Sequence, residues 1–341
     1  MFDERIMMER NDVLIESAFR HWREKGFPYP DLTPYDLWAD FFSLQDSDLK
    51  IIEQGQQATM FEEMLTKQLE VKNDGINTAN HFHPHIWESH ALNMRSPYDA
   101  YLEDRALRKA IRLALETTGK LTDVSIRNKL KIVNGAQMCS NFRPLVAKAI
   151  YQRYLDGNRV LDPSTGYGGR LLGFLSIPGE PTYTGIDPST KTCFGNMAMA
   201  HFFGASERVN IIQSPFEDTG ELGEFDLAFT SPPYFRKEIY SEEPTQSCHR
   251  YQNFAAWLGG FWRPTISRVF DLLRPGGRFV INIQDVTIRK ETYPLISETE
   301  AAMGRAGFVR IDTLEMRFPS FGKGLEKWKV EKVLVYERPA V

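Results

Sequence analysis

A glycine-rich turn and an acidic residue beyond it are the first features that could bind a small molecule. The segment DPSTGYGG runs from Asp162 to Gly169, directly after an apolar strand pattern and before a helical one. Its glycines, Gly166 and Gly168 among them, allow a sharp backbone turn and a close approach to a ligand. Asp187 ends the next predicted strand, 21 residues beyond Gly166. A carboxylate at that place can accept hydrogen bonds from both hydroxyls of a ribose.

This turn contains neither of the two common phosphate-binding patterns. It is not the dinucleotide pattern G-x-G-x-x-G, because Gly169 is followed by Arg170 and two leucines. It also lacks the Gly-Lys-Ser/Thr of a phosphate loop, which disfavours hydrolysis of nucleoside triphosphates. A plain strand–turn–helix connection with a helix-capping acid is the structural alternative. Asp218, after the third predicted strand, can accept a hydrogen bond from an adenine amine or can be a solvated loop acid.

A second segment, Ser231-Pro232-Pro233-Tyr234, follows the apolar strand pattern FDLAFT. Two consecutive prolines cannot donate to a sheet or continue as a helix, so they end the strand in a stiff loop. The Ser231 side chain and the Pro232 carbonyl can accept hydrogen bonds from the exocyclic amine of a flat base. Tyr234 can stack on the ring of that base. An ordinary loop with a buried tyrosine is the alternative.

Taken in order, DPSTGYGG, Asp187 and TSPPY resemble the S-adenosylmethionine-dependent DNA amino-methyltransferases. These enzymes methylate the exocyclic amine of cytosine or adenine. The resemblance covers about residues 138–338 and implies S-adenosylmethionine as the cofactor and a Rossmann-like class I methyltransferase sheet. Family members with serine at the first position of the catalytic loop mostly modify cytosine, so Ser231 slightly favours cytosine over adenine. Base flipping and a restriction-modification context are further implications of the family.

The resemblance also implies which residues form the site. The glycine loop is expected to pack against the methionine part of the cofactor and Asp187 to hold its ribose, while Phe142 matches an aromatic residue that touches the cofactor. The residues expected to bind the cofactor are Phe142, Asp162, Pro163, Thr165, Gly166, Gly168, Asp187 and Asp218. The catalytic residues are expected to be Ser231, Pro232, Pro233 and Tyr234, and the base pocket is expected to include Phe235, Arg236, Glu238 and Tyr240.

The chemistry of amine methylation fits these residue types. An exocyclic amine is a poor nucleophile, and acceptors at Ser231 and Pro232 can stabilise the positive charge that develops on its nitrogen. The methyl sulfonium is already activated, so the protein mainly positions the reactants. A base in a duplex must leave the stack to reach such a pocket. Methylation at carbon 5 of cytosine would need a cysteine nucleophile, and the SPPY loop has none.

The pattern of the chain from residue 136 predicts the elements that position these motifs. Apolar strand patterns alternate with helical ones, which indicates an α/β fold with a mostly parallel sheet and helices on both faces. We expect seven strands, with one long helix over residues 254–273. Ligands of such sheets bind at the carboxyl ends of the strands, where both motifs fall.

The first 135 residues predict a mainly helical N-terminal module, with the methyltransferase domain over residues 136–341. We expect helices over 32–44, 47–71, 96–119 and about 122–133, and a loop over 72–85. Gly166 and Ser231 are only 65 residues apart, which leaves no room for a DNA-reading domain between them. Residues 1–135, with help from the insertion 236–256, are therefore the expected DNA reader.

Composition and charge set the broad class. The chain has 341 residues, 42% apolar and 25% charged, with 41 basic and 45 acidic residues, values that exclude disordered, collagen-like and coiled-coil classes. Residues 1–100 carry −9 and residues 101–170 carry +7. The second block includes Arg105, Arg108, Lys109 and Arg112 at helical spacing, which could form a phosphate-facing stripe or a solvated helix face.

The remaining signals concern metals, location and partners. Four histidines in HFHPHIWESH (His81, His83, His85 and His90) lack the spacing of a structural zinc site, so no metal is expected. Three cysteines, no signal peptide and no apolar run of membrane length favour a cytoplasmic location, bacterial or phage-encoded in a bacterial host. The expected partner is DNA and no membrane; homodimerisation stays open.

Three alternatives to DNA methylation remain at the level of sequence. Related Pro-Pro-Tyr loops also serve RNA base methyltransferases and protein glutamine methyltransferases. A nucleic-acid-binding module that keeps the fold without catalysis is a third interpretation, although the intact glycine loop and SPPY segment argue against it.

Overall fold

The computed structural model of the chain describes residues 2–49, 51–54, 66–70, 72–319 and 328–340. The chain forms two compact units. Unit 1 consists of Met1–Thr33, Pro84–Ser140 and Glu238–Ser241, and unit 2 consists of Pro34–His83, Asn141–Lys237 and Glu242–Val341. The division after Ser140 is close to the boundary predicted at residue 135. Residues 34–83, however, belong to the sheet-containing unit and not to an N-terminal module.

Unit 2 is built on a nine-stranded sheet. In spatial order its strands are β1 (Ile51–Gln54), β2 (Thr66–Glu70), β12 (Val309–Pro319), β13 (Trp328–Glu337), β9 (Leu273–Ile283), β7 (Phe225–Thr230), β4 (Arg159–Asp162), β5 (Thr182–Asp187) and β6 (Val209–Gln213). The five strands from β9 to β6 are parallel, and β13 is antiparallel to both of its neighbours. The expected Rossmann-like α/β fold is confirmed.

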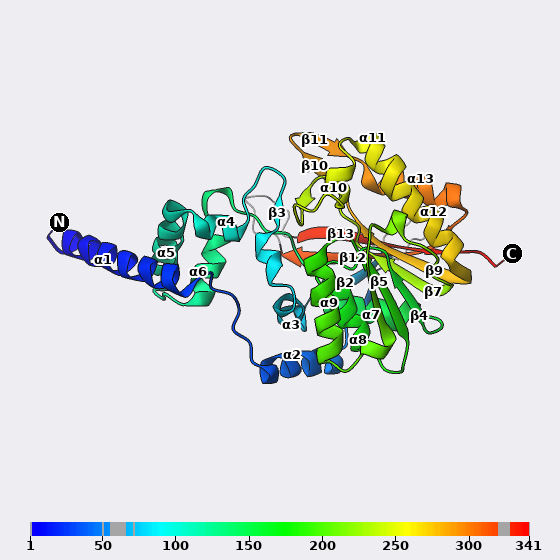
Figure 1. Cartoon of the computed structure of the whole chain (residues 1–341), viewed down its shortest axis with the longest axis horizontal. Helices are drawn as coiled ribbons and strands as arrows, with labels where there is room; N and C mark the ends of the chain where they lie inside the picture. Colours follow the sequence, from blue (N-terminus) through cyan, green and yellow to red (C-terminus); the bar gives the residue numbers. More distant parts are fainter. Residues whose placement is uncertain (1, 50, 55–65, 71, 320–327, 341) are drawn as a thin grey trace. The chain divides into compact units, whose positions relative to one another are not determined.

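Helices cover both faces of this sheet (Figure 1). One face carries α2 (Pro34–Asp46), α7 (Pro144–Tyr154), α8 (Gly169–Leu175) and part of α9 (Thr190–Phe202), and the other carries α11 (Phe254–Trp257), α12 (Arg263–Leu272) and α13 (Leu295–Ala306). The smaller elements of unit 2 are α3 (Ile76–His81), α10 (Ser247–Arg250) and the hairpin of β10 (Val286–Ile288) with β11 (Glu291–Tyr293).

Strand alternation explains why both faces are covered. In β9, Val280 contributes to the core beneath α7 and α8, whereas its neighbours Phe279 and Ile281 contribute to the core beneath α12 and α13. In β13, Val333 and Leu334 divide in the same way. Successive side chains of a strand point to opposite faces, so continuous apolar runs require a helical layer on each side.

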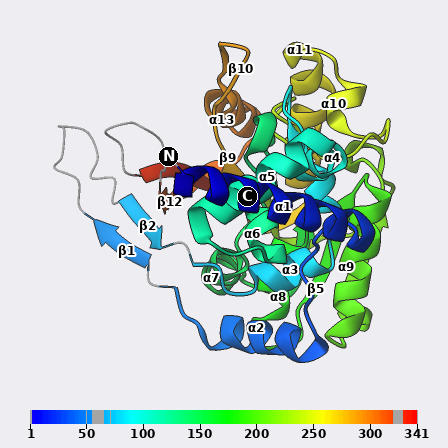
Figure 2. The ribbon, with the colours of Figure 1, turned by 90° about the vertical axis from the view of Figure 1, so that its left-hand side faces the viewer.

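Two strands beyond the predicted seven extend the sheet at one edge (Figure 2). β1 pairs with β2, and β2 lies parallel to β12, with Leu69 buried. The helix predicted over residues 47–71 is therefore wrong where β1 and β2 form, and its central part, residues 55–65, lies outside the described residues. Pairing with the edge of β12 outweighs the modest helix propensity of these residues, because propensity is a weak prior against tertiary contacts.

The loop predicted over residues 72–85 contains the short helix α3. Its N-terminus is capped by a side chain from another helix: Asp40 of α2 accepts hydrogen bonds from the backbone N–H groups of Gly75 (3.1 Å) and Thr78 (2.9 Å). The Thr78 hydroxyl also donates to Asp40, at 2.7 Å. A cap that is 35 or more residues distant in sequence leaves no local signal, so the prediction missed this helix.

The long helix predicted over residues 254–273 is interrupted by a π-helical turn at Leu258–Trp262. Pro264 has no N–H to donate to the carbonyl of Gly260, four residues before it. The Tyr251 hydroxyl donates to that carbonyl instead, at 2.8 Å. The interruption is thus a consequence of the proline, and α11 and α12 continue on either side.

Unit 1 is mainly helical, as predicted. Its elements are α1 (Phe2–Lys25), α4 (Pro97–Leu102), α5 (Asp104–Thr118), α6 (Asp123–Leu130), 3-10 turns at Pro84–Glu88 and Val133–Gly135, and the strand pair of β3 (His90–Ala91) with β8 (Glu238–Ile239). Ser96 caps α4 in a capping box with Asp99, and Gly119 ends α5 with φ of +63°. The single helix predicted over 96–119 divides at Glu103, whose backbone is extended.

The basic stripe predicted on the helix after residue 104 is largely neutralised inside unit 1. Arg108 pairs with Glu16 of α1 at 2.6 Å, and Arg112 pairs with Asp12 at 3.0 Å. Lys109 donates to the side chain of Asn134, at 3.2 Å. These residues join α5 to its neighbours in unit 1, so they do not form the unpaired stripe that a phosphate backbone would require.

None of the helices in the described part of the chain combines the length and the apolarity needed to cross a lipid bilayer.

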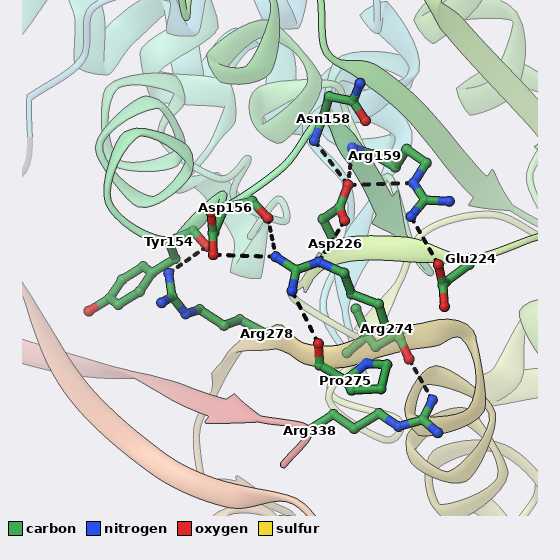
Figure 3. Close-up of polar contacts among 11 residues, drawn as sticks. Tyr154, Asp156, Asn158, Arg159, Glu224, Asp226, Arg274, Pro275, Arg278 and Arg338 are labelled. Atoms are coloured by element: carbon green, nitrogen blue, oxygen red, sulfur yellow. Dashed lines mark hydrogen bonds and ion pairs between the residues drawn. The ribbon is translucent and has the colours of Figure 1, made fainter. Parts of the chain in front are cut away.

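A buried carboxylate stabilises the amino ends of the central strands. Asp226 of β7 is only 6% exposed and accepts hydrogen bonds from the backbone N–H groups of Asn158 (2.9 Å) and Arg159 (2.8 Å). The Arg274 guanidinium donates to its other oxygen, at 2.8 Å, and Figure 3 shows these donors converging on Asp226. A Cβ on Gly157 would lie 2.3 Å from Asp226 Cγ, so only glycine fits there.

We expect Asp226→Ala to lower the free energy of unfolding by about 3 kcal/mol, because it leaves two backbone donors and a guanidinium without their acceptor. Burial would raise the pKa of Asp226, but the N–H groups of Asn158 and Arg159 and the Arg274 guanidinium hold it below its ordinary value. A lowered carboxyl pKa gives stability that is present at neutral pH and lost in acid. Urea unfolding at pH 7 and pH 4 measures both effects.

The matched control is Glu224→Ala, since Glu224 is 55% exposed and pairs with Arg159 at 3.1 Å. An exposed pair contributes at most about 1 kcal/mol. Equal losses in the two variants would contradict the role given to Asp226.

Candidate functional site

The two sequence motifs flank the point where the strand order of the sheet reverses. From β4 the chain proceeds outward through β5 and β6, and then returns to the other side of β4 to form β7 and β9. The glycine loop follows β4 and the SPPY loop follows β7, and these two strands are adjacent and parallel. The crevice at the carboxyl ends of the strands beside such a reversal is the usual ligand site of open α/β sheets.

The glycine loop has one open side and one packed side. Gly166 and Gly168 have positive φ values of +57° and +74°. A Cβ on Gly166 would meet nothing nearer than the Ser164 carbonyl at 4.0 Å, whereas a Cβ on Gly169 would lie 2.0 Å from the carbonyl oxygen of Phe142. Gly169 is therefore required for packing, and Gly166 presents bare backbone to open space.

Asp162 lies beneath this loop and supports it. It is fully buried, and its carboxylate accepts hydrogen bonds from Arg170 Nε (2.7 Å) and Nη2 (3.1 Å), the Tyr183 hydroxyl (2.8 Å) and the Ser164 N–H (3.2 Å). A carboxylate has about four lone-pair positions, and these donors occupy all four. The prediction that Asp162 binds the cofactor is corrected: its acceptor capacity is used within the protein.

Asp187 contrasts with Asp162. It ends β5 with 8% exposure, one oxygen accepting from the Gly166 N–H and the other from the Ser189 N–H, both at 3.0 Å. These two bonds leave each oxygen a second lone pair. Burial raises the pKa of Asp187 to about 6, against the opposing effect of the two N–H groups. The structure thus brings Asp187 to the glycine loop with acceptor capacity remaining.

Two residues that the sequence analysis did not assign brace the loop from behind. Asn196 of α9 donates to the Thr165 hydroxyl (3.1 Å) and to the Gly166 carbonyl (3.0 Å). His83 is fully buried, and a Cβ on Gly168 would lie 2.6 Å from its Cε1 atom. Both contacts come from helices distant in sequence, so no local motif marks them.

Burial lowers the pKa of His83 to about 4, so its ring is neutral at physiological pH, and it lies 2.8 Å from the Ala79 carbonyl. His81 belongs to unit 2 with His83, whereas His85 and His90 belong to unit 1. Among the described residues, no three His, Cys, Asp or Glu side chains are grouped as metal ligands.

Phe142 and Pro163 complete the surroundings of the loop. Phe142 is half-buried, and its ring packs edge-to-face on Phe229 of β7 with centroids 5.4 Å apart. Pro163 directly follows β4 and is buried. Phe142 therefore lies between the strands that carry the two motifs.

The SPPY loop is joined to β9 by hydrogen bonds. The Tyr234 hydroxyl is 3.0 Å from Asn282 Oδ1 and 3.2 Å from the Asn282 carbonyl oxygen, and Ser231 Oγ is 3.2 Å from Asn282 Oδ1. The Tyr234 side chain is buried, while Ser231 and Pro233 remain partly exposed and Pro232 is buried. The four predicted residues are thus one ordered loop, with the Tyr234 hydroxyl directed to β9.

Phe235 differs from its predicted role as a base-pocket residue. Its ring is 5% exposed and packs against Phe254, Trp257 and Tyr293. Its φ is +56°, a left-handed conformation that costs a residue with a side chain about 1 kcal/mol. The Phe235 N–H donates to the Pro233 carbonyl, at 3.0 Å. Phe235 therefore anchors the tight turn through the core and does not face a substrate.

The other predicted pocket residues lie apart from this arrangement or are engaged. Arg236 donates to the carbonyl of Gln252 at 3.2 Å. Glu238 and Tyr240 belong to unit 1, where the Tyr240 hydroxyl donates to Glu238 at 2.5 Å. Because they lie in the other unit, the geometry of the SPPY loop does not include Glu238 and Tyr240.

Asp218 follows β6, as predicted, but it is bound by a residue of the insertion. Arg250 donates to both of its oxygens, at 2.7 and 3.2 Å, and also to Glu217 at 3.0 Å. Asp218 is half-exposed. Arg250, for which the sequence suggested a phosphate contact, is therefore an intramolecular partner of two acids.

No protein-family model and no curated protein matches the chain. Several solved structures resemble unit 2 in part. An S-adenosylmethionine-dependent O-methyltransferase from Thermotoga maritima has 15% identity over 60% of this chain and 68% of its own, with a TM-score of 0.41. For TrmN from Thermus thermophilus the values are 19%, 57%, 48% and 0.38, and for the [4+2]-cyclase SpnF they are 16%, 58%, 82% and 0.43. Since a cyclase is among them, this level of similarity selects no reaction.

Proposed function

We propose that the chain is an S-adenosylmethionine-dependent methyltransferase that modifies the exocyclic amine of a flipped DNA base, with cytosine favoured over adenine. The observation that carries the proposal is the adjacency of β4 and β7. It brings a glycine loop with an open backbone face next to a proline-stiffened loop that carries hydrogen-bond acceptors. A cofactor and a nucleophile in these two loops would share one crevice.

The residues around the glycine loop fit the cofactor. Gly166 leaves space where a side chain would stand, and Asp187 keeps two lone-pair positions for a vicinal pair of hydroxyls. Phe142 adds an apolar ring beside the loop. When bound, S-adenosylmethionine would supply an activated methyl group on a positively charged sulfur. The protein's part is then to hold the ribose at Asp187 and to orient the acceptor of the methyl group.

The SPPY loop fits an amine nucleophile. Ser231 is partly exposed and bonded to Asn282, so its oxygen can accept an N–H from the substrate. Acceptors directed at the nitrogen stabilise the positive charge that develops as it becomes alkylated, and they receive the N–H groups that a neutral carbonyl lacks. The amine then loses one proton to solvent, which leaves a neutral secondary amine.

Incubation of the protein with labelled S-adenosylmethionine and unmethylated duplex DNA, RNA or a protein mixture tests the proposal. We expect label in DNA, and digestion followed by mass analysis should identify N4-methylcytosine or N6-methyladenine. Label confined to RNA would favour an RNA base methyltransferase, and label confined to protein would favour a glutamine methyltransferase. Cofactor binding with no transfer to any of the three would favour a non-catalytic module. Each of these results would overturn the DNA assignment.

Cofactor affinity is expected to fall by about tenfold when the pH is lowered from 7 to 5, because Asp187 with a pKa of about 6 becomes largely protonated. Asp162 raises this pKa and Arg170 lowers it, and both are constant over this range of binding chemistry. A raised carboxyl pKa stabilises the fold as the pH falls, so unfolding at Asp187 does not explain the loss. Calorimetric titration with S-adenosylhomocysteine measures the affinity.

The control for this pH dependence is Asp187→Asn, which cannot titrate and should bind weakly and equally at both pH values. An undiminished tenfold change in that variant would show that another group is responsible.

A further inference from the structure

A buried asparagine of β9 connects the two hydroxyl groups of the SPPY loop. Asn282 is 3% exposed, and its Oδ1 atom lies 3.2 Å from Ser231 Oγ and 3.0 Å from the Tyr234 hydroxyl. On its other side, Nδ2 donates to the backbone carbonyl of Lys332 in the neighbouring strand β13, at 3.0 Å. Asn282 was not singled out in the sequence, where it is one polar residue in an apolar strand.

The Lys332 carbonyl determines which way the Asn282 amide faces. A carbonyl oxygen can only accept, so the amide nitrogen must be the atom directed to Lys332, and Oδ1 must face the two hydroxyls. Oδ1 in turn can only accept. The Ser231 hydroxyl therefore donates its proton to Asn282. The Tyr234 hydroxyl lies closer to Asn282 Oδ1 than to Ser231 Oγ, at 3.0 against 3.4 Å, so it donates to Asn282 as well.

This arrangement leaves Ser231 with lone pairs and no available proton on its partly exposed side. A serine hydroxyl that is free to rotate can donate or accept, and would receive a carbonyl as readily as an amine. A serine whose proton is held by a buried acceptor offers only acceptance. A substrate carbonyl placed there would oppose lone pair to lone pair, and a substrate N–H would be paired.

We infer that Asn282 is a positioning residue that makes Ser231 an obligate acceptor, so that the site selects nucleobases with an exocyclic amine over those with a carbonyl at the same position. The inference rests on the proposed function for the place of the substrate. It goes beyond that function by naming the residue that determines selectivity and the chemical feature it selects.

Paired nucleosides test this selectivity without methyl transfer. Deoxycytidine and deoxyuridine differ at one exocyclic group, amine against carbonyl, as do deoxyadenosine and deoxyinosine. Binding of each to the full-length protein saturated with sinefungin can be measured by ligand-observed NMR. We expect the wild-type protein to prefer the amine of one pair by about tenfold, the size of one hydrogen bond lost to a mismatched partner.

Asn282→Leu has a similar volume and removes the acceptor, so the preference should fall below about twofold. Asn282→Asp keeps an acceptor facing Ser231 and should retain most of the preference. In the Ser231→Ala background, Asn282→Leu should cause no further loss, which separates action through Ser231 from a general structural role. Asn282→Ala supplies the same comparison if the leucine variant does not fold, as judged by sinefungin affinity.

Several results would overturn the inference. They are the absence of an amine preference in the wild-type protein for both pairs, a preference that survives Asn282→Leu, and additive losses in the double variant. Failure of the DNA assignment would look different. If label enters RNA or protein only, while the amine preference depends on Asn282, the DNA assignment falls and the role of Asn282 stands.

Discussion

Ser231→Ala is expected to reduce the rate of methyl transfer by about 100-fold while cofactor affinity stays within twofold of the wild type. Removal of one preorganised polar group from a site where charge develops costs about 100-fold or more. Ser231 is bonded to Asn282 of β9 and makes no described contact with the glycine loop, so the cofactor site is unaffected. Single-turnover transfer to DNA and titration with S-adenosylhomocysteine measure the two quantities separately.

Two further variants sharpen this prediction. Ser297→Ala removes an exposed hydroxyl of α13 that donates to the Pro294 carbonyl at 3.3 Å, and it should leave the rate unchanged. Tyr234→Phe keeps the ring and loses only the hydroxyl directed to Asn282, so its rate should lie between those of Ser231→Ala and the wild type. Full activity of Ser231→Ala would refute the placement of the substrate amine at the SPPY loop.

Asp187→Ala is expected to weaken binding of S-adenosylhomocysteine by about 100-fold. Hydrogen bonds to a charged acceptor are each worth about 1.5–3 kcal/mol, and a loss of about 2.7 kcal/mol corresponds to 100-fold in affinity. The substitution also removes the acceptor for the Gly166 and Ser189 N–H groups. The loop and its ligand contact are therefore weakened together, and calorimetry on the folded variant gives the combined effect.

The other predicted cofactor acid supplies the control. Asp218 is half-exposed and already bonded to Arg250, so Asp218→Ala should change the affinity by less than about threefold. If Asp218→Ala weakens binding as much as Asp187→Ala, the adenine contact first suggested for Asp218 is restored. If neither variant affects binding, the cofactor does not lie at the ends of β5 and β6.

The strands and most helices of unit 2 were predictable, because apolar runs bounded by glycine and proline carry their own boundaries. The sequence reasoning failed where the stabilising partner is distant in the chain. α3 is capped by Asp40, and β2 is held by β12, and neither partner is visible in a local window. Pro264 was visible, but the π-helical turn it causes also depends on the Tyr251 hydroxyl.

The roles of the site residues divide in a similar way. Asp162 and Asp187 are both acids at strand ends, and sequence alone treats them alike. Only the tertiary structure shows that four donors occupy Asp162 and that two donors leave Asp187 with lone pairs. Phe235, next to the catalytic motif, is a core residue because its left-handed backbone turns the ring toward Trp257.

The sequence by itself determined the α/β class, the two loops that could do chemistry and their place at strand ends, because periodicity, glycine and proline act over a few residues. Only the tertiary structure decided the strand order that brings the two loops together, the acceptor capacity of each acid and the position of Asn282. Those properties depend on donors and acceptors tens of residues apart, whose distances are determined only when the sheet has formed.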